Sequence, residues 1–148
     1  MTVGQKKSPR VAEALEALER ASLRKTPQRV AIVRAFVDDT SHPTAQAIFD
    51  RLRRAMPTMS FATVYNTLAA LERAGVCRTL ELDGPAGAGG RRFDPMVAPH
   101  DHAVCDRCGA VHDVPRRGDT ASKPEVEGFH VRAVERLYRG ECGECRAQ

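Results

Sequence analysis

Two Cys-x-x-Cys pairs constrain the C-terminal third of this chain more than any other feature of its sequence. The first pair is Cys105 and Cys108, and the second is Cys142 and Cys145. Two residues between paired cysteines let the backbone turn both sulfurs toward one point, and two such pairs supply the four thiolates of a tetrahedral structural Zn²⁺ site. Because such a shell leaves no open coordination position, the zinc would stabilise the fold rather than catalyse a reaction.

Two disulfides are the alternative for the same four cysteines. The chain opens with the polar residues 1–10 and no signal peptide, which is typical of a protein from a reducing compartment, where structural disulfides are rare. We therefore expect a cytoplasmic protein that binds zinc. The fifth cysteine, Cys77, lies among apolar residues and is expected to be a small buried side chain without a role of its own.

The positive charge of the chain is concentrated outside this metal-binding region. Residues 1–94 contain 15 Lys and Arg against 10 Asp and Glu, whereas residues 95–148 contain 8 against 9. A basic N-terminal part is compatible with a polyanionic partner, although solvated helical faces are often equally rich in arginine. No apolar run reaches membrane-spanning length, so we expect no membrane partner.

The N-terminal half predicts four helices. Start signals occur at Ser8-Pro9, Thr26-Pro27, Pro43-Thr44 and Ser60, and Gly75 stands where a helix end favours glycine. Apolar residues recur at helical spacing after each start. These are Val11, Leu15 and Leu18, then Val30, Val33 and Val37, then Ile48 and Leu52, and finally Val64, Leu68 and Leu71.

A hairpin is predicted to follow the helices. Residues 76–82 alternate like a half-buried strand, and residues 91–93 can pair back onto it. The glycine-rich residues 84–90 between them form the hairpin tip rather than a phosphate loop, since no helix follows and the expected lysine is missing. Helices followed by a hairpin are typical of a winged helix-turn-helix. We therefore predict an α+β chain with a winged-helix domain over 1–93, a proline-stiffened hinge over 94–99 and a small metal-binding domain over 100–148.

The fourth helix, residues 60–74, is the one that a winged helix inserts into the major groove of double-stranded DNA. With its apolar stripe in the core, its first turn presents Ala62, Thr63, Tyr65 and Asn66 outward. Small groups, a hydroxyl, an aromatic ring and an amide suit thymine methyls, adenine edges and phosphates. Periodicity alone leaves Tyr65 equally able to pack at the helix edge. The basic half, the hairpin and the helix order favour DNA binding.

The run His100-Asp101-His102 predicts a second metal site. In a strand over residues 100–105, His100 and His102 point to one face, and Asp101 and Cys105 point to the other. A strand over residues 111–114 could pair with it and bring Asp113 close. The alternative is an ordinary polar strand face, but the nearby carboxylate favours a metal site with nitrogen and oxygen ligands.

Several short motifs follow one another in order along the chain. They are Thr26-Pro27-Gln28-Arg29, His42-Pro43-Thr44-Ala45, Ala62-Thr63-Val64-Tyr65-Asn66-Thr67-Leu68, Arg92-Phe93-Asp94, His100-Asp101-His102 with Cys105-Asp106-Arg107-Cys108-Gly109, and Cys142-Gly143-Glu144-Cys145. Together they resemble the ferric-uptake-regulator (Fur) superfamily over residues 10–145. The resemblance implies a homodimeric, metal-responsive transcription repressor, not an enzyme. Its winged helix would bind a palindromic operator, and residues 100–148 would form an α/β dimerisation domain.

The resemblance also implies a regulatory Fe²⁺ or Mn²⁺ site. The family's ligand positions fall on His42, Asp94, His100, His102 and Asp113. Asp94 in place of cysteine argues against a zinc-uptake regulator. Asp113 in place of glutamate, together with Tyr65-Asn66, resembles the peroxide-sensing, PerR-like branch. In that branch, the reaction of bound Fe²⁺ with peroxide oxidises a ligand imidazole, here His42 or His100, and the repressor releases DNA.

Other functions fit parts of the same pattern. An iron-sensing uptake regulator of the same family is the nearest alternative, and a switch in which oxidised thiols release zinc is another. A zinc hydrolase or deaminase is disfavoured, because the chain has no His-x-Glu or His-Glu-x-x-His element and its candidate ligands are spread across the hinge.

Two departures from the family pattern concern the C-terminal domain. Relatives with a further metal site have histidines where this chain has Pro99 and Val134, so we expect that site to be absent. Residues 116–124 are polar and about three residues short of the family's usual helix, which leaves open a helix near 119–127, whereas residues 128–131 and the strand pattern after them still fit. His112 and His130 match no ligand position and are expected at the surface.

Overall fold

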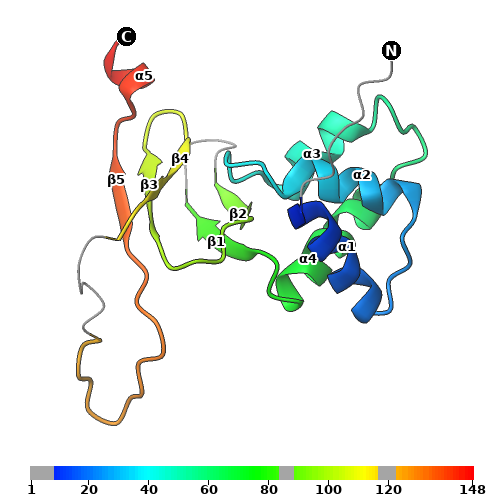
Figure 1. Cartoon of the computed structure of the whole chain (residues 1–148). Coiled ribbons are helices and arrows are strands. Elements are labelled where there is room, and N and C mark those ends of the chain that lie inside the picture. The colour runs from blue at the N-terminus through cyan, green and yellow to red at the C-terminus, as the bar shows by residue number, and fades with distance from the viewer. Residues whose placement is uncertain (1–8, 84–88, 117–122) are drawn as a thin grey trace. The chain divides into compact units, whose positions relative to one another are not determined.

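The computed structural model describes residues 9–83, 89–116 and 123–148, whose helices and strands are shown in Figure 1. These residues form two compact units. The first contains residues 9–82 and 90–97, and the second contains residues 98–116 and 123–148 together with Asp83 and Gly89. In the described ranges, every helix is too short or too polar to cross a membrane.

Four helices open the first unit, and side chains cap three of them. Each capping hydroxyl, from Thr26, Thr44 or Ser60, accepts the backbone N–H of the residue three positions later. This bond satisfies one of the N–H groups that a helix start leaves without an intrahelical partner. The start predicted at Ser8 lies outside the described residues. The helices are α1 (Pro9–Arg20), α2 (Pro27–Phe36), α3 (Ala45–Leu52) and α4 (Phe61–Arg73).

The apolar stripes of these helices meet in one core. The predicted stripe of α4, formed by Val64, Leu68 and Leu71, is completely buried. Phe36 of α2 packs edge to face against Phe93, with ring centroids 6.3 Å apart, so the hairpin shares the core of the helices. Cys77 is also buried in this core, and burial raises the pKa of its thiol to about 12. Its predicted role as a small buried side chain is confirmed.

The hairpin consists of β1 (Arg78–Leu82) and β2 (Gly90–Asp94), which pair antiparallel with Arg78 opposite Asp94. β1 begins two residues later than the strand predicted over residues 76–82, because α4 ends in a Schellman motif. Gly75 adopts a φ of 73°, its N–H bonds the carbonyl of Glu72, and the N–H of Val76 bonds the carbonyl of Leu71. Of the predicted tip, residues 84–90, residues 84–88 lie outside the described residues, and Gly90 is the first residue of β2 rather than part of the tip.

The second unit contains a three-stranded sheet of order β4-β3-β5. The central strand β3 (Asp101–Cys105) pairs antiparallel with β4 (Val111–Val114) and parallel with β5 (Leu137–Gly140), and the short helix α5 (Gly143–Arg146) follows. The pairing predicted between residues 100–105 and 111–114 is confirmed. Of the possible helix near 119–127, residues 123–127 are not helical and the remainder lies outside the described residues.

Candidate metal centres

The four paired cysteines converge in the second unit. Each offers a sulfur, and the four sulfurs lie within 4.8 Å of one another. The sulfurs of Cys108 and Cys142 are 3.8 Å apart and no disulfide is formed. A disulfide would hold them at about 2.05 Å, whereas a tetrahedral zinc with Zn–S bonds of about 2.3 Å separates its sulfurs by about 3.8 Å. The donor set and spacing therefore fit a structural zinc ion.

The sheet and α5 position these thiols from both sides. Cys105 ends β3, and the turn that follows closes with a 2.8 Å bond from the N–H of Gly109 to its carbonyl. Cys142 precedes α5, and its N–H donates to the sulfur of Cys105 over 3.3 Å. This hydrogen bond is the largest of the causes that lower the pKa of Cys105 to about 6. Backbone N–H groups thus favour the thiolate form that a metal requires.

Two histidines and a carboxylate form a second cluster in the same unit. His102 lies directly opposite Asp113 in the pairing of β3 with β4. Nε2 of His100 is 3.1 Å from Oδ1 of Asp113, and Nε2 of His102 is 3.7 Å from the same oxygen. The imidazole rings have centroids 4.4 Å apart, and Nδ1 of His100 lies 2.7 Å from the carbonyl of Ala98. A carbonyl bonded at Nδ1 orients the ring and leaves Nε2 as the metal-facing nitrogen.

Asp101 lies between these histidines in sequence but has different partners. Its carboxylate is buried and bonds Nε of Arg116 at 2.8 Å, while Nη1 of Arg136 lies 3.7 Å away. Arg116 also donates to the carbonyl of Val134 over 2.5 Å. The alternation predicted for the strand thus separates an Asp–Arg cluster from the His pair. The two arginines could not be predicted, because nothing in the polar segments around them marks a partner for Asp101.

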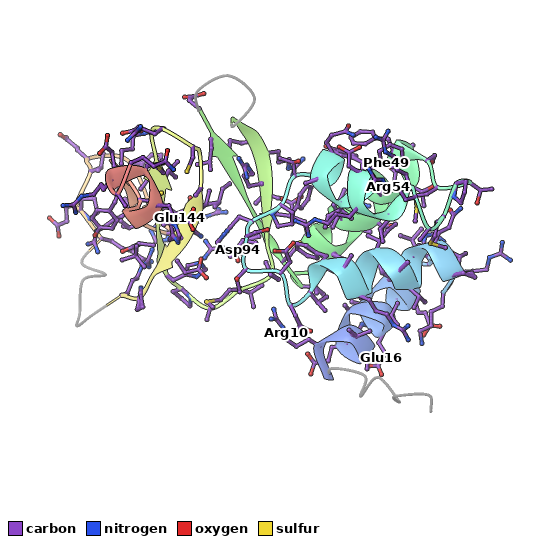
Figure 2. All side chains as sticks on the ribbon, turned by 90° about the horizontal axis from the view of Figure 1, so that it is seen from above. Arg10, Glu16, Phe49, Arg54, Asp94 and Glu144 are labelled. Carbon is purple, nitrogen blue, oxygen red and sulfur yellow. The ribbon has the colours of Figure 1, made fainter. Side chains whose placement is uncertain are left out.

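The first unit contains the other two predicted ligands. His42 is fully buried, and its Nε2 lies 3.8 Å from Oδ1 of Asp94. Asp94 is the last residue of β2 and accepts the N–H of Met96 over 2.8 Å (Figure 2). The loop that carries His42 is held to this strand, because the N–H of Phe93 donates to the carbonyl of Pro43 over 2.9 Å. His42 has a φ of 53°, a left-handed conformation that is uncommon for residues other than glycine.

The five residues offer imidazole nitrogens and carboxylate oxygens, and no thiolate. These nitrogen and oxygen donors suit Fe²⁺ or Mn²⁺ better than a set of four thiolates does, because both ions accept nitrogen and oxygen ligands. Each unit contributes donors, with the buried His42 and Asp94 in the first and the buried His100 and His102 and the half-buried Asp113 in the second. The remaining histidines, His112 and His130, are exposed as predicted.

The first turn of α4 is the exposed face predicted to bind DNA. Ala62, Tyr65 and Asn66 are exposed, and Thr63 is half-buried, with its hydroxyl 2.9 Å from that of Ser60. Next to them Phe61 is 43% exposed, a larger apolar surface than Tyr65 presents at 38%. The sequence pattern did not single out Phe61, because it stands at the helix start before the periodic stripe begins.

Known proteins resemble this chain over most of its length. The profile of the ferric uptake regulator family matches residues 20–135. The peroxide operon regulator of Bacillus subtilis (strain 168) is 38% identical over 136 residues, which are 90% of this chain and 91% of that protein. A structure of PerR from Streptococcus pyogenes, solved in work on peroxide sensing and gene regulation, is 29% identical with a TM-score of 0.52 and covers 97% of this chain and 98% of its own. The Helicobacter pylori ferric uptake regulator, with three functional metal binding sites, has a TM-score of 0.68 over 92% of this chain and 93% of its own, and at 21% identity this likeness concerns the fold alone.

Proposed function

Since the chain belongs to the ferric uptake regulator family, we propose that it is a peroxide-sensing transcription repressor whose binding to DNA depends on a metal ion. The observation that carries the proposal is the pair of distinct donor sets, four thiolates in one and only imidazoles and carboxylates in the other. Members of this family are transcription regulators rather than enzymes. The relative named as a peroxide operon regulator supports peroxide as the signal.

The two donor sets would have separate tasks. Cys105, Cys108, Cys142 and Cys145 would hold a structural zinc. His42 of the DNA-binding domain, Asp94 at the start of the hinge, and His100, His102 and Asp113 beyond the hinge would hold one regulatory Fe²⁺ or Mn²⁺. Only residues 95–99 separate Asp94 from His100, and at about 3.5 Å per residue both ligand groups can reach a common ion.

A shared ion would couple metal binding to DNA binding. We assign DNA binding to residues 1–93, the hinge to residues 94–99 and dimerisation to residues 100–148. With ligands on both sides of the hinge, the bound state selects one angle between the domains. In a homodimer, that angle sets the spacing of the two α4 helices, and only one spacing matches a palindromic site in double-stranded DNA.

Peroxide would act by removing one of these ligands. A bound Fe²⁺ would supply an electron for the reduction of hydrogen peroxide, in which one peroxide oxygen leaves as water and the other is left to oxidise a ligand side chain, whereas Mn²⁺ in the same shell would not. The imidazole of His42 or His100 would gain an oxygen atom and lose its ability to donate to the ion. The hinge would then be released, and the DNA-binding residues Ala62, Thr63, Tyr65 and Asn66 of the two α4 helices would no longer match the operator.

The experiment compares iron-loaded and manganese-loaded dimer on an operator selected from random-sequence DNA. We expect peroxide to abolish binding only of the iron-loaded protein and to add one oxygen atom to a peptide that contains His42 or His100, while zinc is retained. Peptides with the exposed His112 and His130 are internal controls and should keep their masses. Unchanged binding and masses would favour an iron sensor, and zinc loss with oxidised cysteines would favour a thiol switch.

A further inference from the structure

We propose that Arg91, on strand β2, is a positioning residue that fixes the ring of Tyr65 and so sets how well α4 recognises thymine. The inference rests on the proposed function, because it assigns a task to the DNA-binding face. It concerns only the first unit, in which both residues lie. The two side chains are 26 positions apart in sequence, and Nη1 of Arg91 donates to the phenolic oxygen of Tyr65 over 3.1 Å.

Arg91 is itself held in place by two carboxylates. Its Nη2 lies 2.6 Å from a carboxylate oxygen of Glu72 on α4, and its Nε lies 3.6 Å from Glu81, its partner across the hairpin. The other carboxylate oxygen of Glu72 accepts the hydroxyl of Thr79 over 2.7 Å. The guanidinium plane is also 5.7 Å from the ring centre of Phe93. Arg91 therefore connects β2 to two residues of α4 through a fixed planar fork.

Tyr65 is restrained at both ends although it is exposed. Arg91 holds its hydroxyl, and its ring lies 6.3 Å from that of Phe61 at a tilt of 32°. Phe61 in turn packs edge to face on Phe49 of α3, with ring centroids 6.1 Å apart; Phe49 is labelled in Figure 2. An exposed tyrosine on a helix would otherwise exchange between rotamers. With the hydroxyl oxygen held by Arg91, the ring is oriented, and its edge offers a fixed apolar contact for a thymine methyl group.

The surroundings of Arg91 favour positioning over direct phosphate binding. Two carboxylates already neutralise the guanidinium, which is only one-third exposed. A phosphate would have to displace Glu72, which Thr79 holds from the other side. Restraint of a side chain before binding removes an entropic cost of association. Loss of this restraint should therefore weaken DNA binding without changing the number of phosphate contacts.

The test uses the manganese-loaded, full-length dimer and an operator selected from random-sequence DNA, with fluorescence anisotropy as the readout. Arg91→Lys and Tyr65→Phe should each weaken binding about fivefold, a size expected for one freed side chain. The double variant should be no weaker than either single variant, because both remove the same bond. Replacement of operator thymine by uracil should reduce binding less in each variant than in the wild type, and the slope of affinity against salt should not change.

The matched control is Arg20→Lys, the same exchange at an exposed position in the last turn of α1, and it should bind like the wild type. Tyr65→Phe removes only one exposed hydroxyl, so its DNA binding can be measured even if the Arg91→Lys variant does not fold. Additive losses, a shallower salt slope or unchanged thymine preference would overturn the role of Arg91. Wild-type binding with unaffected variants would overturn this inference alone, whereas a wild type that selects no DNA would overturn both it and the proposed function.

Discussion

At the residue scale, the partners of a buried or half-buried carboxylate decide whether that carboxylate can bind a metal ion. Asp113 faces two imidazoles, His100 and His102, and neutral imidazole is the commonest metal ligand among protein side chains. Asp101 faces guanidinium groups instead, which stay charged and cannot share a metal. The two aspartates lie on paired strands of one small sheet, and their neighbours alone distinguish them. Asp113 is placed to bind a metal ion, and Asp101 is placed to pair with arginines.

Glu72 allows a prediction from pH. The hydrogen bond from Thr79 is the largest cause that lowers its pKa from the ordinary 4.5; partial burial opposes the shift and Arg91 adds to it. A pKa that is lower in the folded state contributes stability above the unfolded value, and this contribution disappears as pH falls below about 4.5. Denaturant unfolding at neutral pH and at about pH 3 should therefore show a smaller acid-induced loss in Glu72→Gln than in the wild type. Equal losses in the two proteins would show that the carboxylate has no such role.

At the element scale, the end of α4 decides where the hairpin starts. The N–H groups of Gly75 and Val76 return to carbonyls of the last helical turn, so Val76 and Cys77 belong to the helix cap rather than to β1. The φ of 73° at Gly75 lies in the left-handed region, where any side chain with a Cβ is disfavoured by about 1 kcal/mol. This single backbone angle sets the direction in which the chain enters the hairpin.

Replacement of Gly75 by alanine should therefore lower the free energy of unfolding by about 1 kcal/mol. An added Cβ would meet no atom within 4 Å, so backbone strain is the sole cause to consider. Gly140→Ala is the matched control, because that position is equally open and has no positive φ. Denaturant unfolding of both variants measures the difference. A Gly140→Ala loss as large as that of Gly75→Ala would refute the explanation from the helix cap.

The elements that the sequence predicts are those whose signals are local. Thr26, Thr44 and Ser60 each combine a cap with an apolar stripe in the next turns, and all three mark helix starts. The convergence of the Cys-x-x-Cys pairs and the approach of Asp113 to His102 follow from short spacings in the same way. The parallel pairing of β5 with β3 could not be predicted from a local signal, because all four β5 residues are exposed and show no alternation. The bond between Arg91 and Tyr65 depends on the packing of the hairpin against α4, which no local pattern records.

At the scale of the whole molecule, the two units are stabilised by different means. In its described residues, the first unit buries an apolar core of sixteen residues, including Phe36, Ile48, Leu68 and Phe93. In the described part of the second unit, the buried apolar residues are Val104, Val111 and two of the zinc-site cysteines, Cys105 and Cys145. Within one protomer, so small a core offsets little of the conformational entropy of three ordered strands. The second unit should therefore depend on its metal for folding, whereas the first should not.

Removal of zinc should unfold the second unit and leave the first folded. A zinc ion bound by the four thiolates would join the end of β3 to α5, and so anchor β5, which directly precedes α5, beside β3. Hydrogen exchange after strong chelation should show lost amide protection in β3, β4 and β5 and retained protection in α2 and α4. Cys142→Ser should reproduce this pattern without a chelator, while Cys77→Ala, the matched control, should keep its zinc. If metal analysis shows that the protein is free of zinc and the β3 amides are still protected, the sheet is stable by itself. Hydrogen exchange reads the strands directly, so this result does not depend on DNA binding.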